Sequence, residues 1–166
     1  MKFSVNNNTI KVKGRDIMTD KTGADGDTVK LLRECDSGIK MGISAIDDVI
    51  NDVQNYDFKT LLSDSKSQHQ KLQEEIDMLL IKHADDGKEP SPMAKSMSKM
   101  KTNMKMAFDG SDNTIADLIT DGCNMGVKSL SRYLNQYQSA DSKSKNIASR
   151  LVDIEDRLSV DVRQFL

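Results

Sequence analysis

The stretch "KSQH" at residues 66–69 has the spacing of half a metal-binding motif. In carboxylate-bridged di-iron sites, a glutamate and a histidine three residues later project from one face of a helix. The hard carboxylate bridges two metal ions and the imidazole binds one of them. Here Lys66 stands where the glutamate would be, and His69 stands where the histidine would be. Because an ammonium group cannot bind a metal ion, this motif keeps one of its two ligands.

Two amphipathic helices are predicted in the first half of the chain. Apolar side chains recur at steps of three, four or seven over residues 27–56, which Asp27 can cap, and over residues 57–85, which Asp57 can cap. The stripe of the second helix contains Phe58, Leu62, Ser65, His69, Leu72, Ile76, Leu79 and His83. His69 is therefore predicted to face a core.

Two further helices are predicted over residues 113–138 and 141–165. The sequence "MGISAIDDVIND" at 41–52 aligns with "MGVKSLSRYLNQ" at 125–136, at an offset of 84 residues. Such a repeat predicts two related helical hairpins. Residues 86–112 between the hairpins are too long for a tight turn, so the pattern favours a four-helix bundle with one long crossover.

A family resemblance follows from these segments. The sequences "ECDSGIKMGISAIDDVI" at 34–50 and "DGCNMGVKSLSRYL" at 121–134, with the histidine-bearing helix and a polar crossover between them, resemble the ferritin-like four-helix-bundle superfamily. Within it they are similar to an uncharacterised bacterial family of ferritin-like bundle proteins. The resemblance covers residues 28–166. It implies an all-α fold of two helical hairpins and a crossover that contains a short Met-rich helix, but a fold does not fix a function.

The ferritin-like plan requires six metal ligands, and most of their places hold residues that cannot bind a metal. The repeat and the apolar stripes put these places at Gly42, Gly126, Lys66, His69, Leu151 and Ile154. A small shift of register adds Asp36, Asp121, Glu155 and Asp156 as candidates. We therefore predict no complete di-metal site and no cofactor, with Asp36, His69 and Glu155 as the remaining metal candidates and bound iron as the alternative.

Both histidines also have simple structural interpretations. His69 is predicted to be a core imidazole that is hydrogen-bonded to a neighbour such as Ser65 or to an Asp of the bundle. His83 is predicted to end its helix or to be solvated. Cys35 and Cys123 are too far apart in sequence for a metal knuckle, and we interpret them as small buried side chains.

The segment "MAKSMSKMKTNMKMAF" at 93–108 is the other candidate site. Its methionines recur on one face and its lysines lie on the others, and the simplest prediction is a helix whose Met edge packs on the bundle. A basic, Met-rich amphipathic helix can also bind an anionic membrane or a partner groove. Soft Cu(I) is a third possibility for thioethers. The surface concerned would contain Met97, Lys99, Met100, Lys101, Met104 and Lys105.

Composition narrows the function classes. The 166 residues are 37% hydrophobic, 30% charged and 4% aromatic, and the net charge is -2. Positive charge is not gathered into one face, which argues against nucleic acid as a partner. The chain lacks an apolar run of the roughly 20 residues that span a membrane, and it lacks the apolar stretch of a signal peptide, so a cytoplasmic protein is expected.

Residues 1–26 are predicted to be an arm, either flexible or folded as a short hairpin in which Phe3 and Val5 face Ile10 and Val12. For the whole chain we expect a non-enzymatic interaction, structural or stress-related protein that forms homo-oligomers or binds a protein partner. The alternatives are an iron-storing or iron-oxidising protein, and a protein that binds a membrane surface through residues 93–108.

Overall fold

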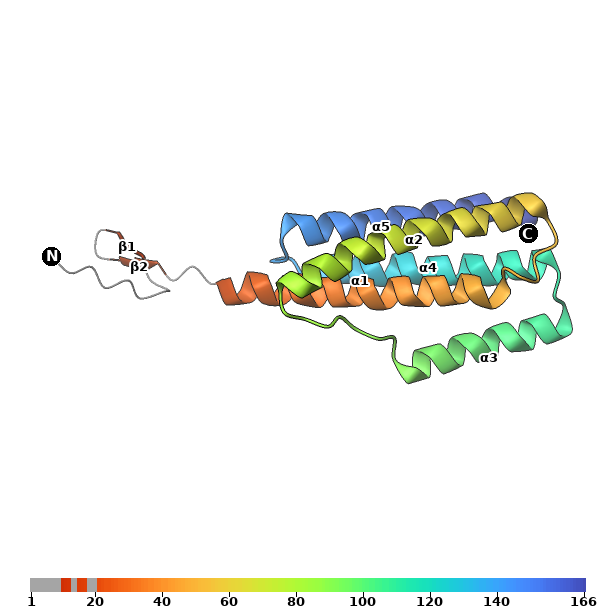
Figure 1. The fold of residues 1–166 in the computed structure, drawn as a ribbon, viewed down its shortest axis with the longest axis horizontal. Helices are drawn as coiled ribbons and strands as arrows, with labels where there is room; N and C mark the ends of the chain where they lie inside the picture. Colours follow the sequence, from red (N-terminus) through yellow and green to blue (C-terminus); the bar gives the residue numbers. More distant parts are fainter. Residues whose placement is uncertain (1–9, 13–14, 18–20) are drawn as a thin grey trace.

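The computed structural model describes residues 10–12, 15–17 and 21–166 (Figure 1). Its elements are β1 (Ile10–Val12), β2 (Arg15–Ile17), α1 (Lys21–Val49), α2 (Tyr56–Lys82), α3 (Pro92–Phe108), α4 (Asp112–Gln136), α5 (Ser142–Asp161) and a final 3-10 turn, η1 (Val162–Phe165). Every element from residue 21 onward is helical, which confirms the all-α prediction. None of the helices in the described part of the chain is both long and apolar enough to cross a membrane.

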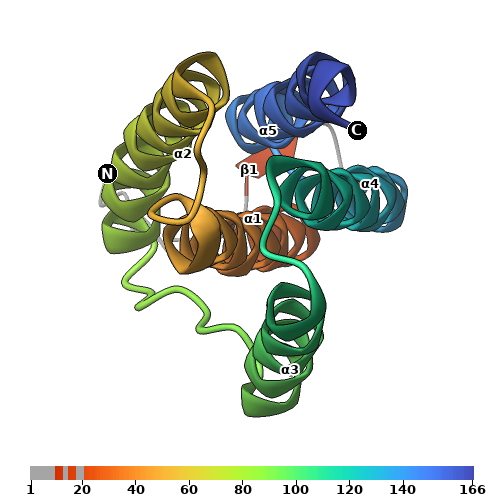
Figure 2. The same cartoon turned by 90° about the vertical axis from the view of Figure 1, so that its right-hand side faces the viewer.

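Four of the helices lie side by side around a common interior, and we call them the four-helix core. Helix α1 packs against α2, α4 and α5, and α5 packs against α2 and α4. Figure 2 shows the four helices end on, with α3 standing outside them against α1 and α4. Helix α3 runs along the outside of the core between the end of α2 and the start of α4 (Figure 1).

Helices α1 and α2 do not begin at the cap residues predicted for them, Asp27 and Asp57. Helix α1 begins six residues before Asp27, whose carboxylate accepts the backbone N–H of Ser139 in the turn between α4 and α5. Helix α2 is capped by Asn55, which accepts the N–H groups of Asp57 and Phe58. Helix α5 is capped by Asp141, whose side chain accepts the N–H of Ser144.

The described part of the N-terminal segment contains a short pair of strands. Strands β1 and β2 pair antiparallel, with Ile10 opposite Ile17. The predicted partners Phe3 and Val5 lie outside the described residues. Because α1 already begins at Lys21, the arm is shorter than the predicted 26 residues.

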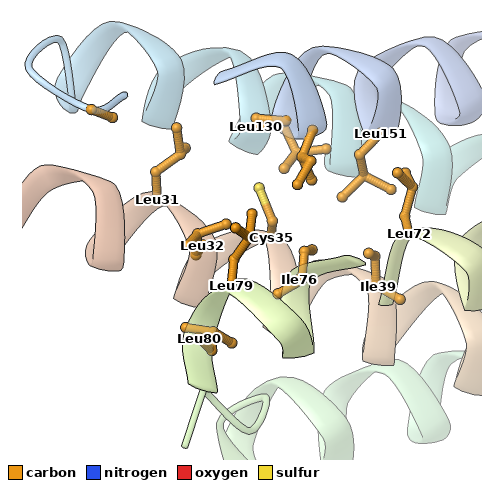
Figure 3. Close-up of a cluster of buried hydrophobic side chains, with 13 residues drawn as sticks. Leu31, Leu32, Cys35, Ile39, Leu72, Ile76, Leu79, Leu80, Leu130 and Leu151 are labelled. Carbon is orange, nitrogen blue, oxygen red and sulfur yellow. The ribbon is translucent and has the colours of Figure 1, made fainter. Parts of the chain in front are cut away.

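Two apolar clusters fill the four-helix core. The first, drawn in Figure 3, lies around Leu32, Ile76 and Leu151. The second lies around Ile46, Phe58 and Leu158. Both clusters draw residues from α1, α2, α4 and α5. Since the residues of α1 in the first cluster end at Ile39 and those in the second begin at Ile46, a short stretch of the interior between them belongs to neither cluster.

Candidate functional site

The stretch between the two clusters contains His69 of α2. The side chain is 1% exposed, which confirms that His69 faces the core. Its Nδ1 lies 2.8 Å from the backbone carbonyl oxygen of Ser65, one turn earlier in the same helix. Its Nε2 lies 3.1 Å from Oε1 of Glu155 on α5, a residue that is 8% exposed. The prediction that His69 is hydrogen-bonded to Ser65 is confirmed, although the acceptor is the backbone carbonyl of Ser65. The carboxylate that contacts His69 belongs to a glutamate and not to the predicted aspartate.

The two contacts of His69 fix where its protons lie. A carbonyl oxygen can only accept, so Nδ1 carries a hydrogen and donates it to Ser65. A second proton must then lie between Nε2 and the carboxylate of Glu155, since two acceptors at this distance would repel each other. Burial opposes the charged imidazole, but the hydrogen bond and the negative charge of Glu155 outweigh it, and the pKa of His69 is raised. The site can therefore hold a proton between Nε2 of His69 and the carboxylate of Glu155.

Two glycines make room for this pair. A Cβ atom on Gly42 of α1 would lie 3.1 Å from Nε2 of His69 and 3.4 Å from Oε1 of Glu155. A Cβ atom on Gly126 of α4 would lie 3.2 Å from Cδ of Glu155. Gly42 and Gly126 are the places at which the ferritin-like plan puts glutamates. The space of a side chain is taken by His69 and Glu155 at Gly42, and by Glu155 at Gly126.

Other buried polar atoms adjoin the pair. Burial and the nearby carboxylate of Glu155 raise the pKa of Cys123, so this thiol stays protonated and is a poor nucleophile and metal ligand. The hydroxyl of Ser65 is buried without a hydrogen-bond partner. Among the described residues, no group of three or more His, Cys, Asp or Glu side chains is arranged to hold a metal ion.

The position of Glu155 corrects the sequence interpretation. Leu151 and Ile154 were the predicted places on the last helix, and Glu155 was a candidate only by a small shift of register. The stripe instead runs through Leu151, Glu155 and Leu158, at steps of four and three, and Ile154 is only partly buried. The signal was present in the sequence, because Ile147, Leu151, Leu158 and Val162 leave one gap in a regular stripe, at 155.

Asp36 has a structural role away from this pair. It is 1% exposed and its carboxylate accepts the N–H of Lys88 at 2.7 Å, the side-chain amide of Gln73 at 2.6 Å and the ammonium of Lys40 at 3.1 Å. Next to Lys88, Gly87 has a φ of +80°, and a Cβ atom there would collide with Oδ2 of Asp36. Asp36 thus anchors the connection between α2 and α3, and it is Gly42, not Asp36, that faces His69.

The remaining polar candidates lie at the surface or at a helix end. Lys66, which replaces the motif's glutamate, pairs with Asp47 of α1. Asp121 pairs with Lys101 of α3, and Asp156 is exposed. His83 is the C-cap residue of α2, which confirms the prediction that it ends the helix.

Helix α3 lies the other way round from the predicted orientation. Met93, Met97, Met100 and Met104 are 73%, 62%, 61% and 59% exposed, so the Met edge points away from the four-helix core. We call these four side chains the Met face. Met106 is the methionine of α3 that packs on the second cluster. It follows Met104 by two residues and so lies on nearly the opposite side of the helix.

Ion pairs explain this orientation. Lys101 and Lys105 pair with Asp121 and Asp117 of α4, and Lys99 lies 3.9 Å from Asp48 of α1. A fourth lysine, Lys95, pairs with Glu89 in the preceding connection. The lysines turn the charged side of α3 toward acidic side chains of the core, which leaves the methionines outward. The prediction that the Met edge covers the bundle is therefore wrong.

Both cysteines are buried and free, as predicted. Burial, with the charges of Glu34 and Asp36, raises the pKa of Cys35 to about 12.

Comparison of the chain with models of protein families, with curated proteins and with solved structures gave no match.

Proposed function

We propose that this chain is a ferritin-like four-helix bundle that has no complete di-metal site and that acts, without catalysing a reaction, by self-association or by binding a partner. The observation that carries this proposal is the packing of Gly42 and Gly126 against His69 and Glu155. Two bridging carboxylates would have to occupy the volume that the buried pair already fills.

The connectivity supports the ferritin-like part of the proposal. Six residues join α1 to α2 and five join α4 to α5, whereas the whole of α3 and its flanking segments lie between the two pairs. A ferritin-like bundle has the same plan of two hairpins and one long connection. The glycines Gly42 and Gly126 also stand at the repeat offset of 84 residues, and both lie against the same buried pair.

The proton chemistry of the site supports a structural role for the pair. A buried imidazole that already shares a proton with a carboxylate has no free nitrogen for a metal, because Nδ1 is bonded to the carbonyl of Ser65. A second candidate function, binding through α3, is favoured by the exposed Met face. Our proposal also includes that the protein is cytoplasmic and does not bind nucleic acid, which is compatible with both candidate functions.

Iron chemistry is the test, since storage or oxidation of iron is the rival function. Ferrous iron would be added anaerobically at two equivalents per chain, and air would then be admitted while absorbance is followed. We expect oxidation no faster than in buffer and no absorbance of an oxo-bridged iron pair. Oxidation that is faster than in buffer, and that is lost in His69→Ala, would contradict the proposal and assign an iron centre to the site.

A further inference from the structure

The orientation of α3 is unusual for an amphipathic helix on a protein surface. Such a helix normally packs its apolar side on the core and exposes its charges. Here the lysines face acidic side chains of the core, and the Met face, with each member 59–73% exposed, points outward. The apolar side of the helix is therefore available to something outside the four-helix core.

The charge of α3 indicates what that partner is. Residues 92–108 contain four lysines and no acidic residue. Lys101 follows Met100 directly and lies at the edge of the Met face, and its side chain is 51% exposed. Lys95 and Lys99, whose side chains are 50% and 61% exposed, lie on the side of the helix away from the Met face. A complementary surface is apolar in its interior and anionic at its boundary.

The shape of the segment favours a lipid surface over a protein groove. Figure 2 shows α3 outside the four-helix core, where it contacts α1 and α4 along one side only. Its 17 residues make a helix about 25 Å long. The Met face carries none of the Trp, Tyr or Arg anchors that concentrate binding energy in protein interfaces. Unbranched methionines adapt to an irregular, fluid surface. Basic residues beside an apolar helix face are the features of helices that lie in a membrane interface.

We propose that α3 binds anionic lipid bilayers, with the Met face in the apolar boundary and its lysines on the headgroup phosphates. This inference names the partner of the surface-acting protein proposed above, and it rests on that proposed function. The ion pairs of α3 with Asp48, Asp117 and Asp121 compete with lipid phosphates for the same lysines. They are partly exposed surface pairs, which are individually weak, so exchange is feasible.

Sedimentation of the full chain with lipid vesicles tests the proposal. One set of vesicles is phosphatidylcholine alone, and the other contains about 40% phosphatidylglycerol, a fraction that makes the surface strongly anionic. We expect binding to the anionic vesicles only, and a fall of about tenfold when salt is raised from about 0.05 to 0.5 M, because screening weakens the lysine contacts. Met97→Ser/Met100→Ser should lower binding by about tenfold or more. The matched control Met78→Ser/Ile81→Ser removes equally exposed apolar side chains from α2, and it should bind like the wild type.

A second pair of variants tests the competition. Asp117→Asn/Asp121→Asn frees Lys105 and Lys101, and we expect binding about thirtyfold tighter, at roughly 1 kcal/mol for each of the two lysines released to the surface. Asp153→Asn/Asp156→Asn makes the same change of net charge at exposed positions of α5 and should give a smaller increase.

Several outcomes would overturn the lipid proposal. The proposal is wrong if neither the wild type nor Asp117→Asn/Asp121→Asn binds either kind of vesicle. It is also wrong if Met97→Ser/Met100→Ser and Met78→Ser/Ile81→Ser lower vesicle binding equally. Circular dichroism melts of each variant separate loss of binding from loss of folding. A negative vesicle result with no iron oxidation removes the lipid partner alone, whereas iron oxidation would remove the proposed function.

Discussion

The interior of the four-helix core and the outer side of α3 contrast in how their side chains are partnered. Between the two apolar clusters, His69 and Glu155 are polar and buried, and each hydrogen-bonds the other. On α3, the methionines are apolar and exposed, while the lysines beside them are paired with acids of the core. The buried His69–Glu155 pair finds its partners within the chain, whereas the Met face is not covered by the chain. This difference is the reason why we propose that the chain acts through its surface.

The largest expected effect comes from breaking the buried pair. His69→Leu leaves the Glu155 carboxylate buried without its partner, and we expect a loss of about 3 kcal/mol in the free energy of unfolding. The double variant His69→Leu/Glu155→Leu removes both polar groups and should recover most of that loss. Urea unfolding of the two variants measures both values. A double variant as unstable as the single one would contradict the role of the pair as mutual partners.

A smaller effect is expected from filling the space beside the pair. Gly42→Ala places a Cβ atom 3.1 Å from the His69 ring, and we expect a loss of about 1–2 kcal/mol in the free energy of unfolding. Gly122→Ala, on α4, is the control, since a Cβ atom there meets nothing within 4 Å. Alanine favours a helix over glycine, so this variant should gain up to about 1 kcal/mol. If Gly42→Ala and Gly122→Ala changed the free energy of unfolding in the same direction, Gly42 would not be in close contact with the pair.

The pH dependence of stability sharpens the account of the pair further. Because the pKa of His69 is raised above its ordinary value of 6.5, its stabilising contribution is fully present below that value. The contribution is lost as the pH rises through the pKa of the folded state. The stability difference between the wild type and His69→Gln should therefore shrink toward alkaline pH.

The smallest effect on stability is expected at the Met face. Met97→Ser/Met100→Ser should change the free energy of unfolding by no more than about 0.5 kcal/mol, because both side chains are already largely exposed. Leu72→Ser in the first cluster is the contrasting variant, since Leu72 is 1% exposed and its loss leaves a cavity in the core. Thermal melts compare the two. A large loss in the α3 variant would show that the Met face is packed.

Much of the fold could be predicted from the sequence because buried stripes have a helical period. The stripe through Phe58, His69 and Ile76 correctly placed His69 in the core. Gly42 and Gly126 were placed at the ligand positions by the repeat, and both lie against the His69–Glu155 pair. A glycine within a helix costs stability, so its presence already indicates a close neighbour.

The orientation of α3 could not be predicted in the same way. Periodicity shows that Met93, Met97 and Met100 share a face, but it does not say whether that face meets the core or solvent. The answer depends on aspartates of α1 and α4 that are distant in sequence, such as Asp48 and Asp121. Glu155 was named as a metal candidate, but its hydrogen bond to His69 was not predicted, because the two residues lie on different helices and 86 positions apart in the sequence.

Metal content tests the central claim most directly. Protein purified without a chelator would be analysed for iron, manganese and zinc against its own concentration, beside a His69→Ala sample. We predict far less than one metal ion per chain in both samples, because the pair is closed by its own hydrogen bonds. Near-stoichiometric metal in the wild type that disappears in His69→Ala would contradict the account and make His69 a metal ligand.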